Sequence, residues 1–422
     1  MPVSDGYLSE TAQDTVYRGG AVRAHDAGPC GVDTREASLR LAGMDGFCNA
    51  PFGRCGTGID DRPVQPRDEI LQIDGKLSRA CPAERQETDM SKKILIINTG
   101  GTLSSVMKGN GLMPGLSIRD MQKELQIVSG DIDIEIEDFC SLDSANIFPE
   151  DWSVLAEHIS SRRNDYDGIV VIHGTDTLAY TSSMLSFMLR NINIPVVITG
   201  SQLSIINPVA DAMENCRCAI HMAASRIPGV FVAFNRKVML GCRASKVRSL
   251  SFDAFESINY PDIATISSLG MRIDEAAVPE RTGIFKLANT YSDRVGLIKM
   301  FPGIHRDVFE SMAERGYKGL YVEAYGIGGM PFLKHDFITT LDRLIKGGMT
   351  VVIGTQCVYE GSKMDVYETG KRALEAGALE AHDMTCEAAL TKLMWILGMT
   401  DEPAEIRDYY SMNMAGELTV KR

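Results

Sequence analysis

The chain has 422 residues, of which 44% are hydrophobic and 23% are charged, a composition typical of globular proteins with room for two or three domains. Its formal net charge of −13 argues against binding nucleic acid across a broad basic face. No apolar run approaches the roughly 20 residues that a membrane-spanning helix needs, so we expect neither a nucleic-acid partner nor a membrane segment.

The start of the chain and its cysteines indicate a reducing compartment. No basic segment followed by a continuous apolar stretch, as in a secretory signal, is present. Ten cysteines are scattered without a C-x-x-C pair, which favours free thiols. Cys216 and Cys218 stand two apart on a predicted helix and would point in different directions, which argues against a metal site there. We therefore expect a cytoplasmic protein.

The composition changes near Met90. Residues 1–89 contain one Lys and nine Arg, with scattered Gly and Pro and no helical or strand periodicity. We predict that they form a disordered extension. Two interpretations stay open: an overextended start, with the protein beginning at Met90, or a tail that binds a partner. We favour the first, because the segment has no pattern that would form a core.

A regular alternation of short apolar runs and amphipathic segments begins at Lys92. Buried strands that alternate with helices predict a parallel sheet covered on both faces, as in α/β proteins. In this first block the predicted strands are 94–98, 168–172, 195–199 and 229–234, and the predicted helices are 117–125, 150–163, 177–189 and 208–224.

A second block of the same kind follows the polar stretch 274–293. The predicted strands are 295–300, 319–323 and 350–353, and the predicted helices are 306–314, 337–346, 365–376 and 385–397. The fold class is therefore α/β, with a larger N-terminal and a smaller C-terminal domain.

Two Gly-Thr motifs follow predicted strands: TGGT at 99–102 and HGTDT at 173–177. Parallel strands end at one edge of a sheet, where ligands bind in α/β proteins. We therefore expect Thr102, Thr175 and Asp176 to meet in one crevice.

Simpler interpretations of both motifs exist. The first could be a plain turn or a phosphate cradle, although it matches neither common nucleotide-binding motif. In the second, Asp176 or Thr177 could cap a helix. We interpret His173 as a core histidine. Two Gly-Thr loops at equivalent strand ends are harder to explain by capping alone.

Two more residues are candidates for chemistry. Ser144 lies in a polar loop, DSAN, where its hydroxyl could bind a substrate carboxylate or simply stabilise a turn. Lys246 follows GCRAS and would act as a base if it were packed against Thr175. No G-x-S-x-G or H-E-x-x-H signature is present, so other common hydrolase classes have no visible site.

Together these residues resemble the bacterial cytoplasmic-type, or type I, L-asparaginases of the asparaginase/glutaminase family. The resemblance runs from about Met90 to the C-terminus and rests on ILIINTGGTL, YDGIVVIHGTDTLAYTSSMLSFML, PVVITGSQ, SFDAFESINYP and EAYGIGGMP. It implies an amidohydrolase that converts L-asparagine to L-aspartate and ammonia. It also implies an N-terminal domain over 90–275, a linker over 276–293, a C-terminal domain over 294–422, a homotetramer built as a dimer of dimers, and no metal or organic cofactor.

Carried over motif by motif, the resemblance makes Thr102 the nucleophile, Thr175 and Asp176 the second catalytic pair, and Lys246 the lysine that supports Thr175. Ser144, Thr175 and Asp176 would bind the substrate, with Ser144 and Asp176 at its α-carboxylate and α-ammonium groups. A threonine hydroxyl is a weak nucleophile and needs a base and oxyanion donors, which backbone N–H groups of the two loops could supply. Many relatives carry a tyrosine after TGGT, but Leu112 stands near that position, so the base for Thr102 is left open.

Two alternatives accompany this interpretation. The amidase subunit of a Glu-tRNA amidotransferase shares the Thr motifs, but its N-terminal extension is a β-barrel, and residues 1–89 lack alternating strands. The negative charge of the chain also makes tRNA contact less natural. A non-catalytic amino-acid sensor would keep Ser144 and Asp176 without turnover.

Overall fold

The computed structural model describes residues 91–108, 111–114 and 117–419. The prediction for residues 1–89 lies outside the described residues. Within the described ranges, none of the helices combines the length and the apolar character that crossing a membrane requires.

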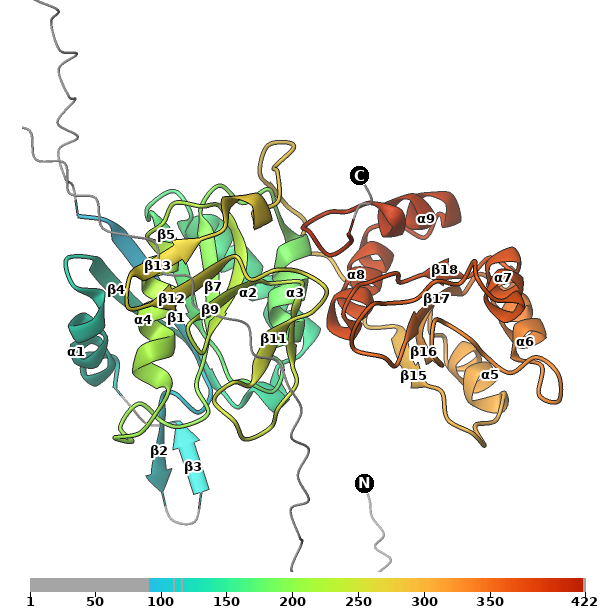
Figure 1. Cartoon of the computed structure of the whole chain (residues 1–422), viewed down its shortest axis with the longest axis horizontal. Helices are drawn as coiled ribbons and strands as arrows, with labels where there is room; N and C mark the ends of the chain where they lie inside the picture. The colour runs from blue at the N-terminus through green and yellow to red at the C-terminus, as the bar shows by residue number, and fades with distance from the viewer. Residues whose placement is uncertain (1–90, 109–110, 115–116, 420–422) are drawn as a thin grey trace, which may run out of the picture. The chain divides into compact units, whose positions relative to one another are not determined.

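The larger domain is built on an eight-stranded sheet with the order β13-β12-β9-β8-β7-β5-β1-β4 (Figure 1). Five neighbouring strands are parallel: β4 (Asp133–Leu142), β1 (Lys93–Gly100), β5 (Gly168–Ile172), β7 (Pro195–Thr199) and β8 (Gly229–Phe234). Every residue of β5 and β7 is buried, as expected for strands with helices on both faces.

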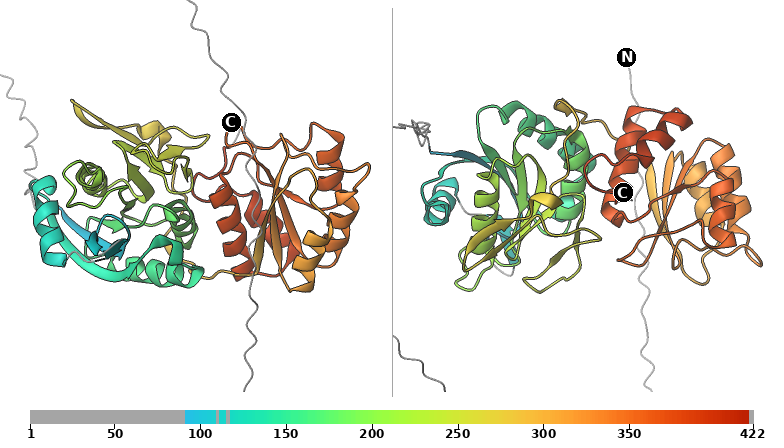
Figure 2. Two further views of the ribbon diagram at one scale, coloured as in Figure 1. Left: turned by 90° about the horizontal axis from the view of Figure 1, so that it is seen from below. Right: turned by 45° about the horizontal axis from the view of Figure 1, so that its top comes forward.

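Helices cover both faces of this sheet (Figure 2). They are α1 (Ile118–Ser129), α2 (Pro149–Arg162), α3 (Leu178–Met188) and α4 (Ala212–Ala223). Contacts pair α1 with α4 and α2 with α3, so each pair shares a face. The steps β5–α3–β7 and β7–α4–β8 move in the same direction along the sheet, yet their helices lie on opposite faces. The second crossover therefore has the opposite hand, which is rare for parallel strands.

The edge of the sheet beyond β8 departs from the parallel pattern. The strands β9 (Lys237–Leu240), β12 (Ala264–Ser267) and β13 (Gly270–Ile273) are antiparallel to their neighbours. Only Asn235 and Arg236 separate β8 from β9, with φ of 47° and 65°. A two-residue turn with two positive φ values joins antiparallel strands, whereas a parallel crossover needs a dozen residues or more.

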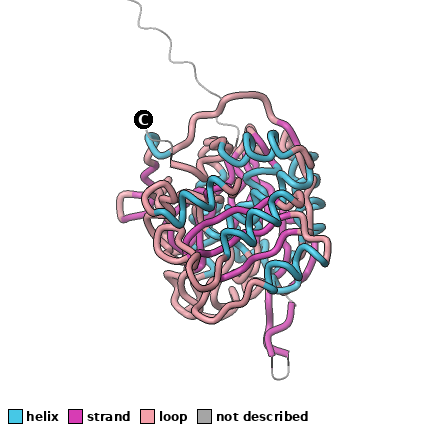
Figure 3. The backbone as a smooth tube through the Cα atoms, turned by 90° about the vertical axis from the view of Figure 1, so that its right-hand side faces the viewer, coloured by secondary structure: helices cyan, strands magenta, loops and turns pink. Residues whose placement is uncertain are grey.

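Shorter elements surround the large sheet. They are the hairpin β2 (Ser105–Lys108) and β3 (Gly111–Pro114), the ladder β10 (Ala244–Lys246) and β11 (Phe255–Ser257), the pair β6 (Leu189–Arg190) and β14 (Lys286–Leu287), and the 3₁₀ turns η1 (Ser144–Asn146) and η2 (Glu275–Ala277). The β2–β3 hairpin begins three residues after Thr102 and projects away from the large sheet (Figures 1 and 3).

The smaller domain contains a four-stranded parallel sheet with helices on both faces (Figure 2). Its strands are β15 (Val295–Lys299), β16 (Gly319–Ala324), β17 (Thr350–Thr355) and β18 (Leu379–Glu380), and its helices are α5 (Asp307–Glu314), α6 (Phe337–Lys346), α7 (Glu368–Glu375), α8 (Cys386–Met399) and α9 (Pro403–Ser411). The prediction of two α/β domains is confirmed.

Helix α8 joins the two domains. It contacts both α3 and β16, and its buried Leu393 and Trp395 belong to the core of the larger domain. A separate core around Phe309, Phe337 and Leu341 fills the other side of the small sheet. Helix α9, which starts with Pro403 in its first turn, was not among the predicted elements.

Candidate active site

The two Gly-Thr motifs lie at the point where the strand order of the large sheet reverses. From β1 the chain passes to β4 on one side, and from β5 it passes to β7 on the other, so β1 and β5 are neighbours whose connections diverge. In open α/β sheets such a switch point leaves a crevice beyond the carboxyl ends of the strands. The motifs at 99–102 and 173–177 follow these two strands.

Glycines allow the two loops to touch. Gly101 has φ +79°, and a Cβ atom on it would lie 2.5 Å from Cα of Gly174. A Cβ atom on Gly174 would in turn lie 2.6 Å from Oγ of Ser144. Such distances are far below van der Waals contact, so only glycine lets the backbones approach this closely. Thr102, Thr175 and Ser144 therefore belong to three loops in direct contact.

Lys246 reaches this junction from β10. Its Nζ atom donates to Oγ1 of Thr175 at 2.8 Å and to Oδ1 of Asp176 at 2.7 Å. Thr175 is 6% exposed, and the side chain of Lys246 is 17% exposed. The structure thus brings together the lysine, the threonine and the carboxylate, although Lys246 is about 70 residues from the other two in sequence.

The hydroxyls and carboxylate of the second motif do not cap a helix. Helix α3 begins at Leu178 with Thr177 at the N-cap position, but no side-chain cap bond is formed there. Instead, Thr177 Oγ1 donates to the carbonyl of Ser144 at 2.8 Å, and Asp176 faces Lys246.

Ser144 is 2% exposed and opens η1, where the Asp143 side chain accepts from the N–H of Ala145. Its Oγ accepts from the N–H of Asp176 at 3.2 Å. Since a hydroxyl can accept and donate at once, the hydrogen of Ser144 stays available for an acceptor in the crevice.

Gln202 is a contact of the site that the sequence analysis did not single out. Its Oε1 accepts from Oγ1 of Thr175 at 3.3 Å, while its Nε2 donates to the carbonyls of Ser249 and Ser251. Two carbonyl acceptors fix the orientation of the amide, so Oε1 must face Thr175. The sequence contains a pattern that could have identified Gln202. This residue follows Thr199-Gly200 at the end of β7, which is a third strand end at the same edge of the sheet.

Thr102 is half-buried, and among the described residues no side chain or backbone group forms a hydrogen bond or ion pair with it. The side chain of Leu112 lies outside the described residues. Two of the backbone N–H groups of the loops are already used: Gly101 donates to the carbonyl of Leu142 at 3.0 Å, and Asp176 donates to Ser144. These two donors are therefore bonded to groups of the protein itself.

His173 is completely buried behind the site and satisfied, as expected for a core histidine. Its Nδ1 lies 2.7 Å from the carbonyl of Gly174, and its Nε2 lies 3.0 Å from Oγ1 of Thr181, which also accepts from the indole N–H of Trp152. A carbonyl only accepts, so Nδ1 carries the proton and Nε2 accepts from Thr181. This chain of hydrogen bonds holds the peptide unit that precedes Thr175.

Burial lowers the pKa of His173 to about 4 from an ordinary 6.5. Below pH 6.5 the unfolded chain binds a proton that the folded chain takes up only near pH 4. We therefore expect the free energy of unfolding to fall by about 3 kcal/mol as the pH drops from 6.5 to 4. Denaturant unfolding at several pH values measures this, and the same slope in a His173→Gln variant would contradict it.

The described residues contain no cluster of three or more His, Cys, Asp or Glu that could hold a metal ion. The six described cysteines are free, and burial raises the pKa of the Cys216, Cys218 and Cys242 thiols to about 12. Thiols this basic are poor nucleophiles at neutral pH. The polar groups described in the crevice are the hydroxyls of Ser144, Thr102 and Thr175, the amine of Lys246, the carboxylate of Asp176 and the amide of Gln202.

Comparisons with known proteins agree with this geometry. The family model described as asparaginase, N-terminal, matches residues 93–279, and the glutaminase/asparaginase C-terminal domain matches residues 294–410. The L-asparaginase of Thermococcus kodakarensis is 43% identical over 332 residues, which are 78% of this chain and 99% of that protein. Its solved structure superimposes with a TM-score of 0.74 at 42% identity and covers 78% of this chain and 100% of that one.

Two further relatives are similar over most of this chain. L-asparaginase 1 of Escherichia coli K12 is 34% identical over 335 residues, with 78% of this chain and 98% of the relative covered. A glutamyl-tRNA(Gln) amidotransferase subunit from Pyrococcus abyssi is 33% identical over 341 residues, with 78% of this chain and 77% of the relative covered. The resemblance inferred from the motifs is thereby confirmed, and the chain belongs to the asparaginase family, with the type I L-asparaginases.

Proposed function

We propose that the protein hydrolyses L-asparagine to L-aspartate and ammonia through a threonine nucleophile. The observation that carries the proposal is the contact of Lys246 with both Thr175 and Asp176 at the switch point, directly beside the loop that holds Thr102. The relatives named L-asparaginase, matched over nearly their whole length, support the same substrate.

In the proposed reaction, Oγ1 of Thr102 attacks the carboxamide carbon of asparagine. The hydroxyl proton passes to the departing nitrogen, the C–N bond breaks, ammonia leaves, and an aspartyl ester forms on Thr102. Water then attacks the ester carbon, the C–O bond to Thr102 breaks, a proton of the water passes to Oγ1 of Thr102 and restores its hydroxyl, and aspartate leaves. Backbone N–H groups and hydroxyls of the two loops stabilise the oxyanion of each tetrahedral intermediate.

In this scheme Thr175 and Lys246 transfer protons during the reaction. The Lys246 amine lies within hydrogen-bond distance of Thr175 Oγ1, which general acid–base catalysis requires. Because Thr175 donates to Gln202, the hydrogen of its hydroxyl must rotate away before it can pass a proton toward Lys246. Gln202 therefore holds the resting orientation of the Thr175 hydroxyl.

Substrate orientation is assigned to Ser144, Thr175 and Asp176. The hydroxyl hydrogen of Ser144 suits an α-carboxylate, and the carboxylate of Asp176, whose side chain is 65% exposed, suits an α-ammonium group. We also propose a homotetramer and a cytoplasmic location, without a metal or organic cofactor.

When Ser144 and Asp176 bind the α-carboxylate and α-ammonium groups of the substrate, the length of the substrate side chain decides whether its carboxamide reaches Thr102. We expect kcat/KM for L-asparagine to exceed that for L-glutamine by about 10- to 200-fold, because one extra methylene displaces the carboxamide from Thr102. Coupled measurement of ammonia release from both amino acids tests this, with D-asparagine as a control for the α-groups. Equal specificity constants would contradict the assigned orientation.

The second candidate is the amidase subunit of a tRNA-dependent amidotransferase, favoured by the 33% identity to the amidotransferase subunit from Pyrococcus abyssi. The net charge of −13 disfavours it, because tRNA contact relies on basic surface. Ammonia release from free asparagine by the purified chain supports the first candidate. Release only with glutamine and Glu-tRNA supports the second, and binding of asparagine without turnover would indicate a sensor.

A further inference from the structure

The strand that carries Lys246 is short and has contacts on both sides. β10 spans Ala244–Lys246 and pairs with β11 in a two-stranded ladder. After Lys246 the N–H of Val247 donates to the carbonyl of Ala254 at 2.9 Å, and the chain then enters the exposed segment 248–252, where the carbonyls of Ser249 and Ser251 accept from Gln202. A lysine side chain has a flexible four-carbon stem, so its amine reaches Thr175 only while its backbone stays within range. The completely buried anchor of this segment, Arg243, lies on the N-terminal side of β10.

Side chains along β10 alternate between the two domains. Lys246 points to Thr175 and Asp176 in the larger domain, whereas Ser245 donates to Oε1 of the half-buried Glu387, on α8, at 2.7 Å. Arg243 shares the parity of Ser245 and points the same way. The smaller domain thus holds one face of this segment while the other face presents the lysine to the site.

Arg243 is the strongest of these anchors. Its side chain is completely buried, and its donors all go to the C-terminal part of the chain. Nε donates to the carbonyl of Gly416 at 2.7 Å, Nη1 donates to the carbonyl and Oδ2 of Asp383 at 3.0 Å each, and Nη2 donates to Oγ1 of Thr419 at 3.3 Å. Only a guanidinium can make this planar set of contacts.

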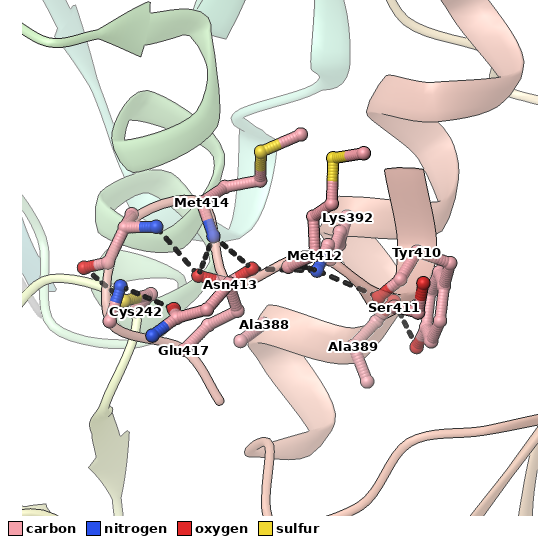
Figure 4. A network of polar contacts seen from close by, with 12 residues as sticks. Cys242, Ala388, Ala389, Lys392, Tyr410, Ser411, Met412, Asn413, Met414 and Glu417 are labelled. Carbon is pink, nitrogen blue, oxygen red and sulfur yellow. Dashed lines mark hydrogen bonds and ion pairs between the residues drawn. The ribbon is translucent and has the colours of Figure 1, made fainter. Parts of the chain in front are cut away.

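The acceptors of Arg243 are themselves anchored. We call residues 410–419 the C-terminal clasp (Figure 4). Lys392 of α8 donates from Nζ to the carbonyls of Tyr410 and Met412 and to Oε1 of Glu417, at 2.8, 2.5 and 2.6 Å. Both side chains of the Lys392–Glu417 pair are 0% exposed.

Backbone groups complete the clasp. Glu417 accepts from the N–H groups of Met414 and Ala415, and the Asp383 carboxylate accepts from the N–H of Thr419 at 3.0 Å. Removing one partner of a buried charged pair leaves the other uncompensated, so breaking the Lys392–Glu417 pair is costly. The clasp therefore presents fixed carbonyl and hydroxyl acceptors to the guanidinium.

We propose that Arg243 is a positioning residue for the reaction, which holds Lys246 against Thr175 because the C-terminal clasp and Asp383 together bind its guanidinium. Arg243 and Lys246 are three residues apart, so their Cα atoms lie within about 11 Å even in extended chain. A shift of the anchor is therefore transmitted to the amine. The proposal rests on the proposed function for its turnover readout, but the placement of the amine is measured without substrate.

The test compares three variants of the full chain. Arg243→Lys keeps the charge and removes the forked contacts, and Thr419→Val removes only the Nη2 contact, in case the first variant does not fold. Leu341→Ala is the matched control, because it opens a cavity in the core beside α6 without touching β10 or the clasp. The melting temperature of each variant is recorded, so that the variants can be compared at similar loss of stability.

Two readouts separate positioning from stability. The first is acetylation of the Lys246 amine by trace acetic anhydride, quantified by peptide mass spectrometry against exposed lysines. The second is the division of any loss between kcat and KM for asparagine. We expect the Arg243→Lys variant to acetylate Lys246 at least about threefold faster and to lose about 10- to 100-fold in kcat with a small change in KM. Thr419→Val should show the same pattern more weakly.

The control should lower the melting temperature and leave both readouts near wild type. The positioning role would be overturned if Lys246 were acetylated at the wild-type rate in both Arg243→Lys and Thr419→Val. It would also be overturned if Leu341→Ala increased the acetylation rate of Lys246 as much as Arg243→Lys does. Failure of the wild-type chain to release ammonia would instead refute the proposed function, while the acetylation comparison would still decide whether Arg243 places the lysine.

Discussion

Replacing Thr102 by alanine should lower kcat for asparagine by about 10⁴-fold, because it removes the proposed nucleophile and nothing nearby can replace it. Ser104, a hydroxyl two residues further along, is buried and donates toward the carbonyl of Gly101. Substrate binding should change little, since Ser144 and Asp176 are unaffected. Single-turnover kinetics and equilibrium binding of asparagine measure the two effects separately.

Thr102→Ser is the control for this variant, because it restores a hydroxyl and should recover much of the activity. Mass spectrometry of rapidly quenched, substrate-saturated enzyme should place an aspartyl adduct on the peptide that contains Thr102. A Thr102→Ala enzyme with near-normal kcat would remove Thr102 from the mechanism.

Replacing Thr175 by valine should cause a loss of similar size. The substitution keeps the volume but removes the hydroxyl that contacts Lys246 and Gln202. A buried apolar group there also leaves the lysine amine and the amide oxygen each without one partner. Steady-state kinetics, with circular dichroism as a check on folding, measures the loss in kcat.

Thr175→Ser and Lys246→Met complete this experiment. Serine keeps the contacts and should retain most of the turnover, while methionine removes the amine and should give a loss that varies with pH if that amine moves the proton. An aspartyl adduct found on Thr175 rather than Thr102 would exchange the roles of the two threonines.

Local sequence predicted the interior of both domains well. The ranges 168–172, 195–199 and 229–234 agree with β5, β7 and β8, and 337–346 agrees with α6. These segments were predicted correctly because a buried strand or a helix packed on a sheet has a clear pattern of apolar residues within its own sequence. The helix predicted from 208 begins only at Ala212. The Asp211 carboxylate accepts from the N–H groups of Gln202 and Leu203, and these bonds keep the preceding residues in a loop.

Elements with weak periodicity were not predicted. The antiparallel strands β12 and β13 have only four residues each, too few to show a clear period, and α9 is a short, mostly polar helix. Their conformation depends on neighbours that are distant in sequence, which no local pattern encodes.

The sequence by itself determined the two α/β domains, the strand-end positions of Thr102, Thr175 and Asp176, and the family, because motifs after apolar strands are local features. Only the tertiary structure decided that Lys246 meets Thr175, that Gln202 orients it, and that Arg243 is seated in the C-terminal clasp. Those contacts join residues 27 to 176 positions apart. They form only once the domains have packed. A hydrogen bond needs its two atoms within about 3 Å, and the intervening sequence does not show which distant residues come that close.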